Sequence, residues 1–367
     1  MNGPEPSIVQ TTSRKSFMTT MIHSIAARRA WTLALAVAGL FVAVDVQAKT
    51  LIKLTTLAPK DSSYDQTLRR MGQEWKKLSG GEVDLVVYAG GVQGGEAAMI
   101  KRMKIGQIQA AMLTAVGLSE LESSVTGLNS MPMMFQNLDE VDYVGTKLQP
   151  RLEQLLAEKG FVVLFWTDAG WVQYFSRKPF RTPDDLRKLK MFSWAGSEKA
   201  DGISKGAGFN PVPLETADIM PGLQTGLIDV VAMPPFYALG TQIYTAASYM
   251  LDLRWAPLVG AAILDKKTWD KLSPEVQKGI RESALQAGKA IKAASRTESD
   301  DAVRTMCDKW GLKVNKPTPD EYAQWRTAFE AVYPQIRGAI VPPDVWDMAI
   351  GAVKEYRAGA TGSAKSN

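Results

Sequence analysis

Residues 223–234 read LQTGLIDVVAMP, and they repeat a phrase that residues 103–114 spell as MKIGQIQAAMLT. In each copy a helical segment ends at a glycine, an isoleucine follows two residues later, and a short apolar run then stops. Such a run is typical of a buried strand, and it is compatible with any α/β sheet. Because open α/β sheets bind ligands beyond the carboxyl ends of their strands, residues 114–118 and 233–237 are candidates for lining a cleft.

The residues around the first copy predict a β-α-β-α-β unit. The alternating segment at 50–58 and the β-rich segment at 82–89 indicate strands. Between them, apolar residues fall at helical spacing until Gly80 and Gly81, and a further helix is expected to start at Glu96. Alternation of this kind is typical of a mostly parallel sheet wrapped by helices.

The second copy lies in a smaller α/β unit that follows a buried strand at 160–167 and an extended aromatic segment at 170–180. Ser273-Pro274 then marks a helix start, and no proline follows until Pro317. A helix from 274 to about 310 would span about 55 Å, so we expect it to cross two lobes. The predicted parts are lobe I (49–169 plus about 259–296), lobe II (170–258 plus about 297–357) and a disordered tail (358–367).

The N-terminus is predicted to be a secretory signal peptide, residues 1–48. An apolar run of 15 residues at 30–44 follows two arginines and precedes VQA at 46–48. The run is short for a membrane span, although a retained anchor is the alternative. We expect cleavage near Ala48, a periplasmic mature protein that does not span the membrane, and translation from Met1, Met18 or Met21.

Composition excludes several classes of function. Residues 1–48 contain four of the Lys and Arg residues and two of the Asp and Glu residues, so their removal lowers the net charge from +5 to +3, too little to indicate nucleic-acid binding. The only histidine, His23, lies in the predicted signal, and Cys307 is the only cysteine. Histidine-based nucleophilic catalysis and a zinc site of His or several Cys are therefore excluded, and no cofactor or metal is expected.

Several separate stretches resemble the solute receptors of tripartite ATP-independent periplasmic (TRAP) transporters, the DctP family. They are AGGVQGGEAAMIKRMKIGQIQAAM (89–112), MPMMF (131–135), FSRKPFRTPDDLRKLKM (175–191), NPVPLETADIMPGLQTGLIDVV (210–231) and DKLSPEVQKGIRESA (270–284). The resemblance implies two lobes of the periplasmic-binding-protein fold, type II-like, closing on one small organic ligand. It also implies delivery to the membrane subunits of a permease and no enzymatic activity.

The chain departs from the family pattern where the family binds a carboxylate. An arginine after the helix that matches TPDDLRKL would form a bidentate bond with the ligand, and this position holds Phe192. A second arginine position matches Val172, and a polar position matches Met233. We therefore expect a ligand that is more apolar or aromatic than a C4-dicarboxylate.

The predicted ligand-binding residues combine aromatic, apolar and polar side chains. Phe192 and Trp194 share one strand face, so they point together to the cleft or to the core. Glu96 is a candidate anchor, or alternatively a first-turn residue that stabilises a helix N-terminus. Ser193 is a further candidate anchor. The full predicted set is Trp171, Gln173, Phe192, Trp194, Met233, Phe236, Tyr237, Glu96 and Thr114.

Three alternatives remain open at the level of sequence. The first is a receptor for a dicarboxylate or 2-oxo acid, bound by a cation that the sequence does not place. Arg254 is the best candidate for that cation, since Arg177 and Arg181 fall in what reads as a solvated turn. The others are a periplasmic enzyme, for which no carboxylate pair at readable spacing is found, and a sensory module with the same fold.

Overall fold

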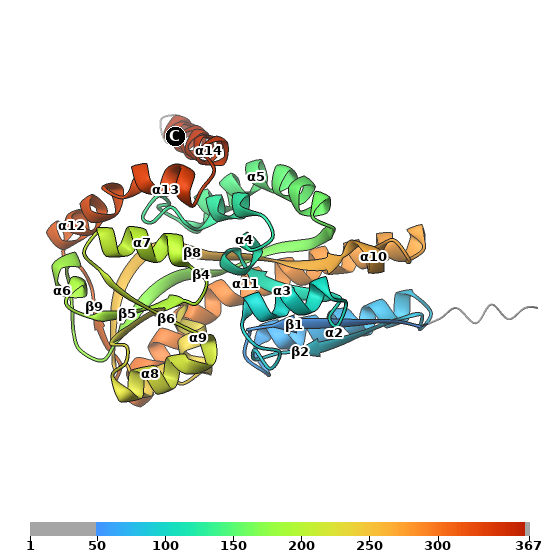
Figure 1. Ribbon diagram of the computed structural model, residues 1–367, viewed down its shortest axis with the longest axis horizontal. Helices are drawn as coiled ribbons and strands as arrows, with labels where there is room; N and C mark the ends of the chain where they lie inside the picture. Colours follow the sequence, from blue (N-terminus) through green and yellow to red (C-terminus); the bar gives the residue numbers. More distant parts are fainter. Residues whose placement is uncertain (1–48, 364–367) are drawn as a thin grey trace, which may run out of the picture. The chain divides into compact units, whose positions relative to one another are not determined.

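The computed structural model describes residues 49–363, with side chains up to residue 359. The predicted signal peptide and residues 364–367 lie outside the described residues. Figure 1 shows the arrangement of the elements. In chain order they are β1 (Thr50–Thr56), α2 (Ser63–Leu78), β2 (Val83–Tyr88), α3 (Glu96–Lys104), β3 (Ala110–Thr114), α4 (Ala115–Ser119), η1 (Ser123–Leu128), α5 (Leu138–Glu158), β4 (Phe161–Ser176), α6 (Pro183–Arg187), β5 (Lys190–Trp194), α7 (Glu198–Gly206), β6 (Asn210–Leu214), η2 (Thr216–Asp218), α8 (Ile219–Thr225), β7 (Val230–Met233), α9 (Pro235–Gly240), η3 (Ile243–Thr245), β8 (Tyr249–Asp265), α10 (Lys266–Trp269), α11 (Pro274–Trp310), β9 (Lys313–Asn315), α12 (Pro319–Glu330), α13 (Tyr333–Ala339) and α14 (Pro343–Ser363).

The described strands form one mixed sheet in the order β2-β1-β3-β8-β4-β7-β5-β6, with β9 paired to β8. β1 runs parallel to β2 and β3, and β5 runs parallel to β6 and β7, as the two α/β units of the sequence predict. Between these two ladders the pairs β3–β8, β8–β4 and β4–β7 are antiparallel. The two repeated phrases therefore end as β3 and β7, one in each parallel ladder.

Two long strands join the parallel ladders. β4 has 16 residues and β8 has 17, and they pair from Phe161 with Asp265 to Ser176 with Tyr249. The sequence predicted a strand and a separate extended segment for the region of β4, whereas the strand is continuous. The pairing of β4 with β8 shifts register at three places, one of them between Asp168 and Trp171. Such bulges bend a strand without ending it.

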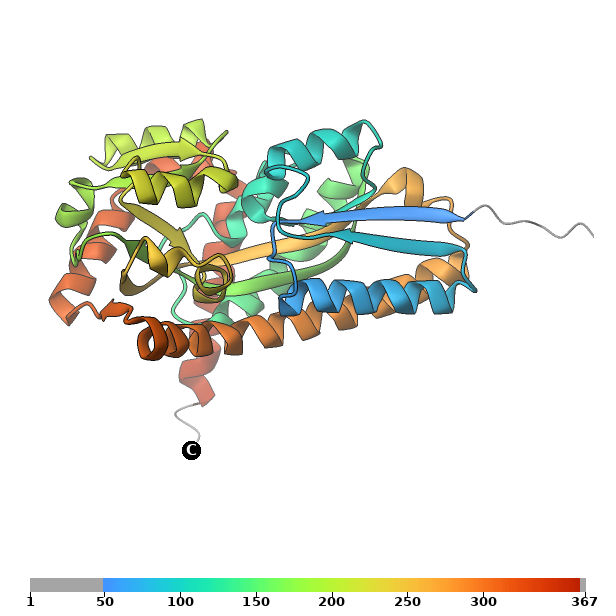
Figure 2. The same ribbon diagram turned by 90° about the horizontal axis from the view of Figure 1, so that it is seen from below.

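Helix α11 has the limits that the sequence predicts, Pro274–Trp310, and 37 residues. The Ser273 hydroxyl accepts a hydrogen bond from the Val276 N–H, and Gly311 ends the helix with a left-handed φ of 70°. Figure 2 shows α11 alongside α2, and the first half of α11 shares a hydrophobic cluster with that helix. The second half, through Ala302 and Met306, belongs to a different cluster that contains residues of α8. One helix therefore packs beneath both parallel ladders.

Helix α14 packs against α5. Val345 and Trp346 of α14 share a buried cluster with Val144 and Leu148 of α5. The sequence assigned these two helices to different lobes. α14 continues to Ser363, into the stretch that the sequence predicted as a disordered tail. Among residues 49–363, no helix combines the length and the apolar character that crossing a bilayer requires.

Candidate ligand-binding site

A cavity of about 390 Å³ opens at the carboxyl ends of β1, β3, β5 and β7. This volume falls within the range of small-molecule pockets, roughly 300–1,000 Å³. Thr114 ends the first repeated phrase and Met233 lies one residue before the end of the second, and both line the cavity. The position follows the general rule for open α/β sheets, in which ligands bind beyond the carboxyl ends of the strands.

The structure places seven of the nine predicted ligand-binding residues in the wall of this cavity and two outside it. Trp171 is buried in a hydrophobic cluster with residues of α5, and Gln173 donates a hydrogen bond from Nε2 to Asp252 Oδ1 at 3.1 Å. Ser193 also lines the cavity, and its hydroxyl donates to Asp201 Oδ2 at 3.3 Å. The seven lining residues are Glu96, Thr114, Phe192, Trp194, Met233, Phe236 and Tyr237.

Glu96 connects α3 to the end of β3. Its carboxylate accepts one hydrogen bond from the Thr114 backbone N–H and one from the Thr114 hydroxyl, each at 2.6 Å. Burial raises the pKa of Glu96 to about 7, although the hydrogen bonds from Thr114 oppose the shift. Gly117 leaves room for this side chain, because a Cβ there would lie 2.6 Å from Glu96 Oε2. Glu96 is therefore an acceptor fixed in place inside the cavity.

Aromatic side chains surround this end of the cavity. Phe192 and Trp194 meet edge to face, with ring centroids 5.0 Å apart. Phe236 stacks on Tyr64 at 5.2 Å, and Tyr64 is a lining residue that the sequence analysis did not select. Burial, followed by the nearby Glu96 charge, raises the pKa of Tyr237 to about 12, so its hydroxyl stays protonated at neutral pH. These rings present apolar faces with a few hydroxyl groups between them.

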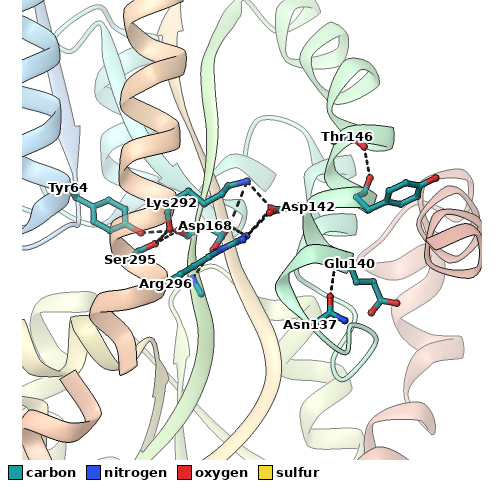
Figure 3. A network of polar contacts seen from close by, with 11 residues as sticks. Tyr64, Asn137, Glu140, Asp142, Thr146, Asp168, Lys292, Ser295 and Arg296 are labelled. Carbon is teal, nitrogen blue, oxygen red and sulfur yellow. Dashed lines mark hydrogen bonds and ion pairs between the residues drawn. The ribbon is translucent and has the colours of Figure 1, made fainter. Parts of the chain in front are cut away.

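A polar network fixes β4 to α11 beside the cavity (Figure 3). Arg296 binds both Asp168, a lining residue, and Asp142 of α5, with the Asp142 bonds at 2.8 and 2.9 Å. Partial burial would raise the pKa of Asp142, but hydrogen bonds from Arg296 and Lys292 hold it below its usual value. The Ser295 hydroxyl donates to the Asp168 carbonyl oxygen at 2.8 Å. None of these residues was predictable from the sequence, because their positions are far apart in the chain.

No arginine, lysine or histidine lines the cavity within residues 49–359. Arg177 pairs with Asp229, and Arg181 binds Glu321 through two hydrogen bonds. Arg254 is exposed on β8 and does not contribute to the wall. The carboxyl groups in the wall are those of Glu96, Asp168 and Asp201. The described residues also contain no cluster of three or more His, Cys, Asp or Glu side chains that could hold a metal ion.

Comparison with known proteins identifies the family. Residues 54–338 match the family model DctP, bacterial extracellular solute-binding protein, family 7. The chain belongs to this family. It is 20% identical over 291 residues to the C4-dicarboxylate-binding periplasmic protein DctP of Rhodobacter capsulatus, covering 78% of this chain and 86% of that protein. As a member of this family the chain is a solute-binding protein and not an enzyme.

Solved structures of similar proteins share the fold. The sugar acid binding protein DctPAm from Advenella mimigardefordensis, in complex with galactonate, has a TM-score of 0.78 and 19% identity, covering 84% of this DctP-family chain and 99% of that one. A TRAP periplasmic solute binding protein from Shewanella oneidensis with bound succinate has a TM-score of 0.77 and 18% identity, covering 83% and 100%. The predicted two-lobe periplasmic-binding-protein fold with its long crossing helix is therefore confirmed.

Proposed function

We propose that this DctP-family chain is a periplasmic TRAP receptor that captures a small organic solute in the cavity at the strand ends and delivers it to TRAP permease subunits in the membrane. The family membership and the position of the cavity support this role. The signal-like sequence that ends near Ala48 supports export. Residues 49–169 with about 259–296, and 170–258 with about 297–357, are the lobes that we propose close on the solute.

We infer further that the solute is more apolar or aromatic than a C4-dicarboxylate. The observation that carries this inference is the cavity wall, which in the described part of the chain contains three carboxyl groups and no cationic side chain. A carboxylate that is removed from water without a paired cation loses several kcal/mol of solvation. Phe192 and Val172, which stand where the resemblance places arginines, both line the cavity. These two side chains offer apolar contacts, whereas arginines at the same positions would offer N–H donors to a carboxylate.

A receptor for an organic acid is the second candidate. The relatives with known ligands favour it, since galactonate and succinate occupy two of the similar structures and the R. capsulatus protein binds C4-dicarboxylates. On that comparison the carboxylate alternative fits better than the apolar one. An organic-acid receptor requires a cationic side chain to reach the solute after the cavity closes. We expect Arg254 to supply that cation.

Native mass spectrometry of the purified mature protein, followed by a thermal-shift panel, separates the two candidates. The panel contains C4-dicarboxylates, sugar acids, aromatic alcohols and aliphatic alcohols. A ligand that binds only the folded state raises the free energy of unfolding by RT ln(1 + [L]/Kd), about 2.7 kcal/mol at 100 Kd. We expect large shifts with the uncharged apolar compounds. Large shifts with acids alone would establish the carboxylate receptor, and abolition of those shifts in Arg254→Met would identify its cation.

A further inference from the structure

The cavity extends along both faces of β5 and β7. Side chains alternate between the two faces of a strand, so Phe192 and Met191 point in opposite directions. Phe192 packs in the cluster with α8, and Met191 packs in another cluster with residues of α6 and α12. Both residues nevertheless line the cavity, as do Met233 and Ala232 of β7. The cavity therefore continues from the aromatic end near Glu96 around the strand ends to the opposite face of the sheet.

We call this continuation the inner compartment. Its wall is defined by six apolar or aromatic side chains from β5, β8, α12, α13 and the residues just before β6 and α13: Met191, Trp255, Phe329, Ile336, Phe209 and Val332. The Trp255 ring is stacked between those of Tyr174 and Phe329, with ring centroids 5.6 and 5.9 Å apart. Three packed rings therefore form this part of the wall. The apolar area of this compartment favours a hydrocarbon group. The Trp255 Nε1–H, which is buried without a hydrogen-bond partner among the described residues, is the one polar group among these six side chains.

The other end of the cavity differs in chemistry. The Glu96 carboxylate there has accepted two hydrogen bonds from Thr114 and retains further lone pairs. When Glu96 is ionised, an anionic group beside it would meet a like charge with no cation in the described wall. A hydroxyl group can donate to the carboxylate without adding a charge to an apolar cavity. The end near Glu96 therefore suits a hydroxyl group and the inner compartment suits a hydrocarbon group, so a single molecule that carries both groups fits the whole cavity.

We propose that the cavity binds an amphipathic solute in one orientation, with a hydroxyl head at Glu96 and a hydrocarbon tail in the inner compartment. This inference rests on the proposed receptor function and adds the class of solute to it. Transfer of each methylene group from water stabilises binding by about 0.8 kcal/mol, which corresponds to about a fourfold change in Kd. Affinity should therefore rise with tail length until the inner compartment is full.

Calorimetric titration with 1-hexanol, 1-octanol and 1-decanol tests the proposal. We expect Kd to fall about fifteenfold for each two added methylenes. Ala232→Leu, which places three more carbons in the inner compartment, should remove the gain in affinity from octanol to decanol. Ala207→Leu, also in the wall, serves the same purpose if circular dichroism shows that Ala232→Leu is misfolded. Ala290→Leu, at an exposed position of α11, is the matched control and should behave as wild type.

Glu96→Gln tests the binding of the hydroxyl head independently of the binding of the hydrocarbon tail. It should weaken all three alcohols by the same factor and leave the dependence on chain length intact. Alkanoates or alkylamines that bind as tightly as alcohols of equal length would overturn the hydroxyl assignment. If the protein binds other organic solutes but affinity does not depend on tail length, the assignment of the inner compartment to the tail is wrong and the receptor function stands. If no compound of either panel binds, the receptor proposal fails first.

Discussion

The Arg296 guanidinium on α11 donates two hydrogen bonds to the Asp168 carboxylate on β4, from Nε to Oδ1 at 3.2 Å and from Nη2 to Oδ2 at 2.7 Å. The Asp168 side chain is only 2% exposed. The backbone carbonyl oxygen of Asp168 also accepts hydrogen bonds from the Tyr64 and Ser295 hydroxyls. The pair therefore joins the crossing helix to the strand that passes between the parallel ladders, at the wall of the cavity.

Substituting Arg296 should destabilise the fold strongly. Arg296→Met leaves the buried Asp168 charge with Lys292 as a distant cation, 3.9 Å away. Loss of one partner from a buried ion pair typically costs about 3–5 kcal/mol, and we expect the lower end because Lys292 remains. Urea denaturation monitored by circular dichroism measures the change in the free energy of unfolding.

Arg304→Met is the matched control on the same helix. Arg304 pairs with Asp301, but both side chains are mostly exposed. Exposed pairs of this kind contribute about 0–1 kcal/mol, so the control should lie close to wild type. Equal destabilisation by the two substitutions would show that the Arg296–Asp168 pair does not hold α11 to β4.

Stability should depend on pH through Glu96. Its pKa is raised from the ordinary value of 4.5 to about 7 in the folded protein, so the folded state holds this proton more tightly than the unfolded state. The corresponding stability is fully present below about pH 4.5 and is lost as the pH rises through about 7. The difference corresponds to about 3 kcal/mol. Glu96→Gln cannot ionise, so it lacks this dependence.

The comparison of wild type with Glu96→Gln cancels the other titrating groups. We expect the wild-type free energy of unfolding, relative to the variant, to fall by about 3 kcal/mol between about pH 4.5 and pH 8. Urea denaturation at several pH values provides the measurement. Parallel pH profiles for the two proteins would mean that the Glu96 pKa is not raised by burial.

Much of the fold follows from local pattern. The limits of α11 were predictable because Ser273, Pro274 and the absence of a proline before Pro317 are signals within one stretch of chain. The continuity of β4 was not, since the segment around Asp168 contains a bulge that resembles a strand end. Only pairing with β8, about 90 residues away in the sequence, shows that the strand continues.

The site was predictable only in part, for the same reason. The repeated phrases indicate strand ends, and residues beside those ends, such as Thr114 and Met233, line the cavity. Tyr64 opens α2 with the spacing of an ordinary core residue, so no local signal marks it as a lining residue. Strand alternation assigns Phe192 and Met191 to opposite faces, and it gave no reason to expect one cavity to contact both.

Phe192→Arg should create affinity for carboxylates. The new guanidinium would enter the cavity wall at the position where the family resemblance places a carboxylate-binding arginine, and a bidentate pair in a dry cleft is strong. We expect succinate to raise the melting temperature of Phe192→Arg in a thermal-shift assay. Phe192→Met, which keeps an apolar side chain of similar length, should show no shift. A succinate shift in the wild type would instead support the carboxylate receptor.

Gly260→Ala should disrupt the junction between β8 and β3 that carries one end of the site. Gly260 pairs with Thr114 across the antiparallel ladder, and it lines the cavity. A Cβ at this position would collide with the Leu113 carbonyl oxygen and lie 3.2 Å from the Thr114 Cα. Because the obstacle is backbone rather than a side chain that can rotate, the strands must separate.

We expect Gly260→Ala to lower the free energy of unfolding by about 3 kcal/mol, at the upper end of overpacking effects. It should also weaken ligand binding, since the displaced β3 carries Thr114 away from Glu96. Gly351→Ala is the control, because a Cβ at Gly351 on α14 meets no atom within 4 Å. In a helix interior that change should stabilise the protein by about 0.5–1 kcal/mol. Urea denaturation of both variants measures the contrast, and a stable Gly260→Ala protein would mean that β3 and β8 do not pair this closely.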